Sequence, residues 1–404
     1  MGIVNRRSLH FLDADRLKKR VEYIIKHDAT IQSLYRSALS AFFRFAGMFI
    51  PVDENMVLFS SFSGKRYDDS PKVLFERMLE RDDCADLHFV WAFNRPNDYR
   101  LPRTQIVKMH SWAYWRAALS AKFWVTNVNI ECGLSFKKKQ QVYVNTWHGT
   151  GNKSFGNLVP GRNDYDFSTV DVFTVDGVFM ADMHHRALNV NYASFVYCGR
   201  PREDELYLAS QSTRREIRDK LGIPENAFVV LYAPTWRDSL TGGNDYSFEA
   251  LLDADRVLES LGENALILYR AHSIVTETRG ISFSERVVDC SVYPNVNELY
   301  IAADLLISDY SSVFADYSIL GKPMLCFAFD YEDYVLSRGL TADFRDDITT
   351  FYNEEDLYSY LCAFSYREES DKTKRFKAKY ISAGGNASDA CIDAMFAASK
   401  SKHD

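Results

Sequence analysis

The segment LLISDYSSVFADYSILGKPMLCF, residues 305–327, indicates the fold class of this chain most directly. An apolar run (304–308) ends in a polar turn, a helix-like segment follows (312–321), and a second apolar run comes next (323–327). Continuous apolar runs of this length are typical of parallel strands that are buried on both faces. The stretch therefore predicts a strand–helix–strand unit, from which doubly wound α/β sheets are built.

The same alternation continues on both sides of this unit. The predicted strands are 56–62, 87–93, 122–127, 141–146, 171–176, 194–198, 228–233, 265–271, 286–289, 304–308 and 323–327. The helical candidates between them include 70–82, 248–262 and 312–321. A boundary near 199–210 separates two strand–helix series of similar size. We therefore expect two α/β domains whose ligands bind at the carboxyl ends of the strands, in the cleft between them.

The expected domain organisation has four parts. A basic, aromatic helical leader covers 1–55, the first Rossmann-like domain covers 56–203, and the second covers 204–385. A terminal helix, 386–404, is expected to pack back on the first domain.

The bulk composition indicates a globular protein. Of the 404 residues, 47% are hydrophobic and 25% are charged, which excludes the disordered and fibrous classes. The seven cysteines occur singly, without a CxxC pair. This pattern favours reduced thiols in a cytoplasm over a disulfide framework or a zinc site.

The leader carries charge of the opposite sign to the rest of the chain. Residues 1–50 hold nine Lys and Arg against four acids, a net charge of +5, so the remainder carries −12. The apolar segment 38–50 is interrupted by Arg44 and is too short to cross a bilayer, but it could lie on an anionic membrane surface. A helical hairpin packed on the body explains the same residues equally well. Nucleic acid is the weaker option, because no binding module is recognisable.

A second informative stretch is VYVNTWHGTGNKS, residues 142–154. A predicted strand delivers His148 to the edge of the sheet, and Gly149 and Gly151 permit a tight turn or close approach to a ligand. A histidine there can accept a proton from a substrate hydroxyl, and Lys153 could offset phosphate charge. A histidine that is merely hydrogen-bonded in a turn is the alternative.

In the opening stretch, Asp309 and Tyr310 form the turn, and Ser311 and Ser312 begin the helix. Serine is a preferred N-cap, and the free N–H groups of a helix start can bind phosphate. Ordinary capping would explain one serine, but not two beside an aspartate. The Gly-Lys pair of a P-loop is missing, which disfavours nucleotide hydrolysis of that type.

Two further strand ends carry cationic side chains. Arg237 lies in the loop after 228–233. Arg270 lies at the end of 265–271 and His272 just past it, and because they are two residues apart they point the same way if extended. A surface salt bridge is the usual fate of a loop arginine. The convergence of these groups with Ser311 and Ser312 at one sheet edge favours a ligand that contains a diphosphate.

Taken together, six motifs resemble those of the CDP-glycerol glycerophosphotransferase family, whose enzymes prime and polymerise wall teichoic acids and related capsular polymers. In chain order they are WHGT (147–150), GRPREDEL (199–206), YAPTWRD (232–238), RAH (270–272), SDYSSVFADYSILGKP (308–323) and FDYEDYVLSRG (329–339). The likeness runs from about residue 56 to the carboxyl terminus.

The resemblance implies a GT-B-type fold, with the donor held by the second domain, the acceptor approached from the first, and no metal or other cofactor. It implies that His148 is the catalytic base, that His272 contacts the donor phosphates, and that Ser311 and Ser312 bind the pyrophosphate. Further positions implied on the donor side are Arg237, Asp238, Arg270, Asp309 and Asp316, and those implied on the acceptor side are Gly149, Thr150 and Lys153.

The implied reaction moves a polyol phosphate from CDP-glycerol or CDP-ribitol to a hydroxyl of a lipid-linked or polymeric acceptor and releases CMP. We expect this reaction at the inner face of the cell membrane, with the protein bound peripherally. Gly151 and Ser273 stand where the family commonly has proline, and the segment 155–168 is less typical, which weakens the acceptor-side assignment. A nucleotide-sugar glycosyltransferase and a non-catalytic binding protein on the same fold are the alternatives.

Overall fold

A computed structural model describes residues 29–235, 247–249, 252–271 and 277–402. Within these residues, the first sheet has seven parallel strands in the order β3-β2-β1-β4-β5-β6-β7. They are β1 (Asp53–Ser60), β2 (His88–Phe93), β3 (Thr104–Lys108), β4 (Ala121–Thr126), β5 (Val142–Asn145), β6 (Val172–Val175) and β7 (Phe195–Tyr197).

The second sheet has six parallel strands in the described part of the chain, in the order β12-β10-β8-β13-β14-β15. They are β8 (Phe228–Tyr232), β10 (Ala265–Tyr269), β12 (Val287–Asp289), β13 (Leu305–Ser308), β14 (Met324–Phe327) and β15 (Thr349–Phe351). In both sheets the chain starts in the middle, moves to one edge, and returns to build the other half. The switch points therefore lie between β1 and β4 and between β8 and β13.

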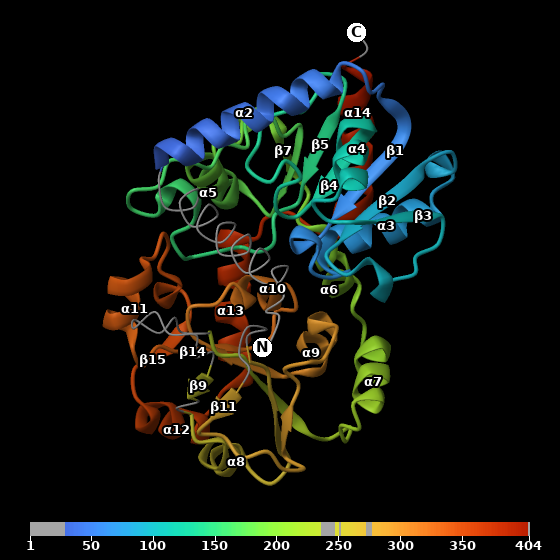
Figure 1. The fold of residues 1–404 in the computed structure, drawn as a ribbon. Helices are drawn as coiled ribbons and strands as arrows, with labels where there is room; N and C mark the ends of the chain where they lie inside the picture. Colours follow the sequence, from blue (N-terminus) through green and yellow to red (C-terminus); the bar gives the residue numbers. More distant parts are fainter. Residues whose placement is uncertain (1–28, 236–246, 250–251, 272–276, 403–404) are drawn as a thin grey trace, which may run out of the picture.

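Helices cover both faces of each sheet (Figure 1). On the first sheet, α3 (Asp69–Glu80) and α14 (Ala387–Lys400) pack on one face. The other face carries α2 (Ala29–Gly47), α4 (Trp112–Ser120) and α5 (Val178–Leu188). On the second sheet, one face carries α7 (Gln211–Lys220), α9 (Val296–Ala302), α10 (Val313–Ser318) and α13 (Tyr366–Tyr380), and the other carries α8 (Ala254–Leu261) and α12 (Glu354–Cys362). Two short helices, α6 (Asp204–Leu208) and α11 (Tyr331–Arg338), complete the set in the described residues.

The central strands are buried on both faces, as the continuous apolar runs predict. Val57, Leu58 and Phe59 of β1 have no exposed surface, and neither do Val229 and Val230 of β8. The prediction of two doubly wound parallel sheets is therefore confirmed.

Two features of the sheets differ from the prediction. The edge strands β3 and β15 were not predicted, because both are short and partly exposed and lack a continuous apolar run. The helix predicted over 248–262 is wrong in its first half: residues Ser247–Glu249 form β9, which pairs with β11 (Glu277–Arg279), and α8 begins only at Ala254. The carboxylate of Asp253 accepts the N–H groups of Asp255 and Arg256, which fixes this later start.

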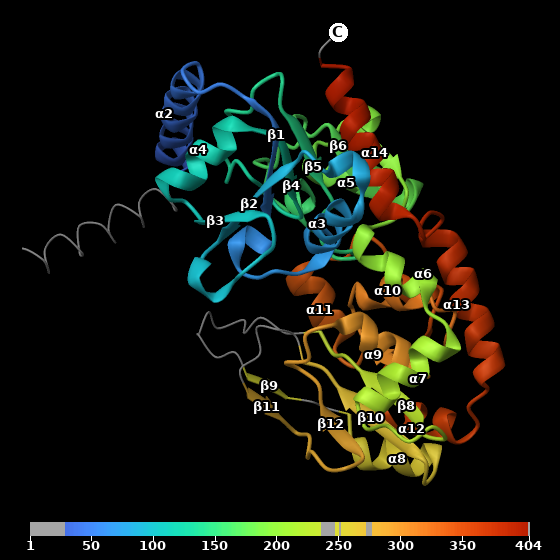
Figure 2. The ribbon, with the colours of Figure 1, turned by 90° about the vertical axis from the view of Figure 1, so that its right-hand side faces the viewer.

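The chain crosses between the two lobes twice. It leaves the first sheet after β7 through residues 199–203, and it returns after α13 through 381–386, so that α14 lies on the first lobe (Figure 2). At the return crossing, the N–H groups of Ser382 and Ala383 both donate to the carbonyl of Asp176, at 2.8 Å each. The two crossings lie side by side, since a Cβ on Gly199 would lie 2.7 Å from the Cα of Gly384.

Helix α2 lies along the outer end of the first lobe (Figure 1). Its inner face packs through Phe43, whose ring lies 4.7 Å from that of Trp115 and 5.4 Å from that of Phe136. No helix in the described part of the chain is long and apolar enough to span a membrane. The rest of the predicted leader, residues 1–28, lies outside the described residues.

Candidate active site

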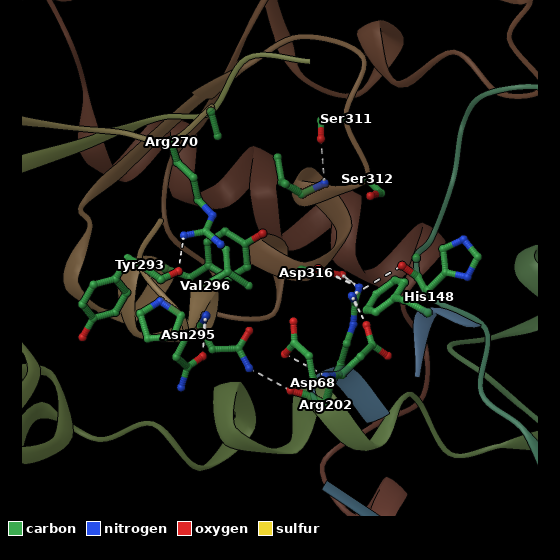
Figure 3. Close-up of a pocket in the computed structure, with 18 of the residues that line it drawn as sticks. Asp68, His148, Arg202, Arg270, Tyr293, Asn295, Val296, Ser311, Ser312 and Asp316 are labelled. Carbon is green, nitrogen blue, oxygen red and sulfur yellow. Dashed lines mark hydrogen bonds and ion pairs between the residues drawn. The ribbon is translucent and has the colours of Figure 1, made fainter. Parts of the chain in front are cut away.

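A cavity of 1070 Å³ lies between the lobes, at the carboxyl ends of both sheets (Figure 3). The first lobe contributes the loops after β1 and β5, and the second contributes the loops after β8, β10 and β13. This is the place that the two switch points predict for a ligand. Its lining includes charged and polar side chains from both lobes.

His148 forms part of the first-lobe wall. Its Nδ1 lies 2.8 Å from the carbonyl oxygen of Asn127, in the loop that follows β4. Because a carbonyl only accepts, Nδ1 carries the proton and donates it, which leaves the lone pair of Nε2 as an acceptor in the neutral ring. Burial lowers the pKa of His148 below its usual range, and the hydrogen bond to Asn127 offsets part of that effect. The neutral, proton-accepting form therefore predominates near pH 7.

A strained turn places His148 at this position. Trp147 has a positive φ of 51°, which costs free energy in a bulky residue. Asn145 at the end of β5 holds the turn, because its side-chain oxygen accepts the N–H of Trp147 at 2.8 Å and its amide donates to the carbonyl of Val128 at 2.7 Å. Behind the turn, the fully buried ring of His184 packs against Trp147.

Thr150 belongs to a buried polar network behind the cavity wall. Its hydroxyl bonds to the carboxylate of Asp176 and accepts from the guanidinium of Arg200. Arg200 also pairs with Asp176 at 2.5 Å and with Glu203 at 2.8 Å, and it has no exposed surface. Burial raises the pKa of both Asp176 and Glu203 despite this pairing. Thr150 thus lies in the framework of the interlobe crossing and does not line the cavity.

Arg202, two residues further along, reaches the cavity and spans both lobes. Its Nη1 donates to Asp69 on α3 at 3.0 Å and lies 3.5 Å from the carbonyl oxygen of His148. Its Nη2 donates to both carboxylate oxygens of Asp316 on α10, at 3.0 and 2.8 Å. Figure 3 shows Arg202 between His148 and Asp316.

The two serines lie on the second-lobe wall, where β13 leads into α10. The prediction that serine acts here as an N-cap through its hydroxyl is not met at Ser312, whose side chain makes no capping hydrogen bond. The hydroxyl of Ser311 accepts the N–H of Val313 at 3.4 Å. Since α10 is only six residues long, its dipole is small, and the hydroxyls themselves are the groups that a phosphate would meet.

The lobes approach each other closely at this point. A Cβ on Gly149 would lie 3.3 Å from the Ser312 hydroxyl oxygen, so a larger residue at this position would make Ser312 shift by a few tenths of an ångström. A few residues on, Lys153 and Leu340 form an antiparallel β-bridge between the lobes. Beside it, the N–H of Thr341 donates to the carbonyl of Asn152 at 2.7 Å. The ammonium of Lys153 lies 5.6 Å from the ring centre of Tyr334.

Asp309 and Asp316 have different surroundings. Asp309 is buried behind the serines, where its carboxylate accepts the N–H groups of Thr235 at 2.9 Å and Tyr310 at 2.7 Å. It thereby ties the loop after β8 to the loop after β13. Asp316 lines the cavity and pairs with Arg202.

Arg270 lines the cavity on the side away from His148 (Figure 3). Its Nη1 donates to the carbonyls of Cys290 at 3.0 Å and Tyr293 at 2.8 Å. Among the described residues, its Nε and Nη2 have no hydrogen-bond partner. Burial lowers the pKa of Arg270, but the group stays cationic because its ordinary value is 12.5. A cationic side chain and two hydroxyl groups thus lie on the second-lobe side of the cavity.

The structure brings most of the predicted site residues together. His148, Gly149, Lys153, Arg270, Ser311, Ser312 and Asp316 all line the one cavity. His272, Arg237 and Asp238 lie outside the described residues. Arg202, Asp69, Tyr293 and Asn297 line the cavity without having been predicted. For Arg202, a signal was present in the GRPREDEL motif (199–206), which supports the resemblance but was given no site role.

Known proteins resemble this chain over most of its length. The family model for CDP-Glycerol:Poly(glycerophosphate) glycerophosphotransferase matches residues 41–397. A teichoic acid poly(glycerol phosphate) polymerase of Staphylococcus epidermidis is 33% identical over 74% of this chain and 43% of its own length. A teichoic acid poly(glycerol phosphate) polymerase of Bacillus spizizenii is 28% identical over 84% of this chain and 96% of its own length. The chain thus spans less than half of the first relative and nearly all of the second.

Solved structures give the same result. The structure of the wall teichoic acid polymerase TagF matches with a TM-score of 0.77 and 27% identity, over 96% of this chain and 99% of that chain. A TagF variant soaked with CDPG matches with a TM-score of 0.76 and 26% identity, over 96% of this chain and 99% of that one. The predicted GT-B-type arrangement of two facing lobes is therefore confirmed.

Proposed function

Because the chain belongs to the CDP-glycerol:poly(glycerophosphate) glycerophosphotransferase family, we propose that it transfers a polyol phosphate from CDP-glycerol or CDP-ribitol to an acceptor hydroxyl and releases CMP. The observation that carries the proposal is the position of two kinds of group on facing walls of one cavity. A proton-accepting imidazole, His148, lies on the first lobe, and anion-binding groups, Ser311, Ser312 and Arg270, lie on the second.

The second-lobe wall suits the diphosphate of the donor. Arg270 offers a cation, and the two serines offer hydroxyl donors and main-chain N–H groups. A TagF structure includes a CDPG soak, which supports CDP-glycerol as the donor for this fold. His272 and Arg237 are proposed to complete the phosphate contacts, from their places in the family motifs.

The proposed reaction is an in-line phosphoryl transfer. The acceptor hydroxyl gives its proton to Nε2 of His148, and its oxygen forms a bond to the phosphorus that bears the polyol. The bond between that phosphorus and the oxygen of CMP breaks, so CMP leaves with the electron pair. Positioning and charge stabilisation supply most of the catalysis, and Arg270 and the serines are placed to stabilise the negative charge. Lys153 at the other edge of the cavity is proposed to meet an anionic acceptor.

The donor panel is the direct test. Purified full-length protein is incubated with CDP-glycerol, CDP-ribitol or a UDP-sugar, together with a synthetic polyol-phosphate acceptor. We expect CMP release and a product heavier by one or more polyol-phosphate units with one of the CDP-polyols, and no turnover of the UDP-sugar. Release of UDP with sugar transfer would instead identify a nucleotide-sugar glycosyltransferase. Mass spectrometry of the product also separates the addition of one unit from polymerisation.

We further propose that α2 binds the surface of an anionic membrane, where a lipid-linked acceptor would lie. One face of the helix packs on the lobe, and the opposite face carries exposed apolar side chains. Ser40, Phe43 and Gly47 lie against the lobe, whereas Leu34 and Phe45 lie on the far stripe with 66% and 59% exposed. Phe49, just beyond the helix, is 72% exposed and packs edge-on against Phe45. The net charge of +5 on residues 1–50 complements acidic lipid.

Removing the outer stripe should abolish membrane binding. We expect the triple variant Leu34→Ser, Phe45→Ser, Phe49→Ser to bind vesicles of acidic phospholipid at least about 100-fold more weakly, because each apolar side chain buried contributes about 1.5–3 kcal/mol. Co-sedimentation with vesicles measures the effect, and Leu208→Ser, which removes an exposed leucine from the second lobe, is the matched control. Turnover of a short soluble acceptor should not change. Unaltered vesicle binding by the triple variant would exclude this surface.

A further inference from the structure

We propose that Arg202 is a positioning residue for the transfer reaction, and that its guanidinium fixes the spacing between His148 on the first lobe and the helix that follows Ser311 and Ser312 on the second. This inference rests on the proposed function. Nothing in the family motifs assigns a role to this side chain.

The main chain of Arg202 is held by both lobes. Its N–H donates to the hydroxyl of Ser70 on α3 at 3.3 Å, and its carbonyl accepts the side-chain amide of Asn297 on α9 at 2.8 Å. The residue lies in the crossing segment itself, one turn before α6. The main chain of Arg202 is thus fixed at the junction between the lobes. A change in the orientation of one lobe relative to the other would alter these contacts.

The guanidinium joins three groups that belong to different parts of the site. Nη1 donates to Asp69 and approaches the carbonyl oxygen of His148, and Nη2 makes a two-pronged contact with Asp316. The planar fork of arginine matches this pattern, whereas an ammonium group offers one point charge. A rotation of one lobe against the other would break at least one side of the bridge.

The ion pairs that Arg202 makes with Asp69 and Asp316 are largely shielded from solvent, so their geometry is restricted. The side chains of Asp69 and Asp316 are 4% and 8% exposed, and that of Arg202 is 18% exposed. Burial disfavours the charge of Arg202, but Asp316 and Asp69 hold its pKa well above the ordinary value. A buried, paired charge of this kind tolerates little displacement, because an unpaired member would be very costly.

Neighbouring Arg200 has a structural role, and its contacts differ from those of Arg202. Arg200 makes its closest contacts with Thr150, Asp176 and Glu203, and its distance to Asp316 is 3.8 Å. It has no exposed surface. Arg202, in contrast, lies on the wall of the cavity and reaches the donor side directly. Arg200 thus stabilises the crossing segment, whereas Arg202 sets the distance between the two walls of the cavity.

Arg202 also acts on His148 through its charge. The charged groups that face His148 are Asp69 on α3, and Arg202 and Arg200 in the crossing segment. In the described part of the chain, His184 on α5 is a further titratable group close by. After burial, which is the largest effect, Asp69 raises the pKa of His148 and both arginines lower it. Removing Arg202 alone leaves Asp69 in place, so the pKa of His148 should rise.

The test compares Arg202→Met with Arg202→Lys, and uses Arg256→Met as the control. Arg256 forms an exposed pair with Glu355 at the far side of the second lobe. For Arg202→Met we expect kcat to fall about 10²-fold, as misplacement of reacting groups typically causes, with the affinity for CDP-glycerol in calorimetry little changed. We also expect its histidine NMR titration to show a higher pKa for His148. Arg202→Lys should keep the low pKa of His148 but not recover kcat, and Arg256→Met should resemble the unaltered protein.

A merely structural role would lower the stability of the variants without moving the titration of His148. The inference is overturned if Arg202→Met keeps normal kcat, if its whole loss lies in donor affinity, or if the titration of His148 does not change. The titration needs no substrate, so it still tests the contact between Arg202 and His148 if the unaltered protein releases CMP from neither CDP-polyol, a result that would overturn the proposed function.

Discussion

Replacement of His148 by alanine is expected to lower kcat by about 10²–10⁴-fold, the range that a positioned general base contributes. The ring is held by the carbonyl of Asn127 with Nε2 as acceptor, so its loss leaves no group in the same place to take the acceptor proton. Binding of the CDP-polyol should be nearly unaffected, because the groups proposed to contact the donor lie on the opposite wall. Stopped CMP release together with normal calorimetric titration of the donor is the expected pair of results.

His185→Ala is the matched control for this variant. His185 follows the buried His184 on α5, and its ring bonds to the carbonyl of Val190, away from the cavity. It should retain full turnover. A His148→Ala protein with normal kcat, or one that has lost only donor affinity, would remove the base role.

The pH dependence of the unaltered protein follows from the same histidine. Because the pKa of His148 is lowered from its ordinary value of 6.5, the ring is neutral and active above that lowered value. The rate should therefore be level through neutral pH and should fall only below pH 6.5, as the ring gains a proton. If kcat/KM instead fell toward acid pH with a midpoint above pH 6.5, a pKa of His148 that is lowered by burial could not explain the profile.

The sequence predicts those parts of the site that follow a strand directly. His148 comes three residues after β5 and Ser311 comes three after β13, so an apolar run with a polar residue behind it is enough to place them at the sheet edge. The sheets were predictable for the same reason. Two of their four edge strands, Thr104–Lys108 and Thr349–Phe351, were not, because they depend on pairing with a neighbour and carry little apolar pattern of their own.

The contacts of the crossing segment could not be predicted in this way. Arg202 meets Asp69 and Asp316, which are 133 and 114 residues away in the chain. No local pattern encodes such a meeting, because it depends on how the two lobes are oriented. The role of Thr150 shows the same limit: its place in the WHGT motif implies the acceptor side, whereas its hydroxyl bonds to Asp176 and Arg200 behind the wall.

Replacement of Arg200 by methionine is expected to destabilise the protein by about 3–5 kcal/mol, the usual result of removing one partner from a buried ion pair. Arg200 is completely buried between two carboxylates, Asp176 and Glu203, and methionine fills much of the space but carries no charge. The two carboxyl groups would remain in a region that is almost free of water, with only the more distant Arg202 to offset them. Urea denaturation at neutral pH measures the loss.

The pH dependence of this loss separates charge from packing. Burial already raises the pKa of Asp176 and Glu203 above their ordinary values of 3.8 and 4.5, and loss of Arg200 raises both further. The folded variant then binds more protons than the unfolded chain, so its stability falls as pH rises above these ordinary values through the raised pKa of each group. The deficit should be larger at about pH 8 than at about pH 5. Adding Asp176→Asn and Glu203→Gln to Arg200→Met should recover part of the stability and remove its dependence on pH. A loss of stability that is equal at both pH values would show that lost packing, and not unpaired charge, destabilises the crossing.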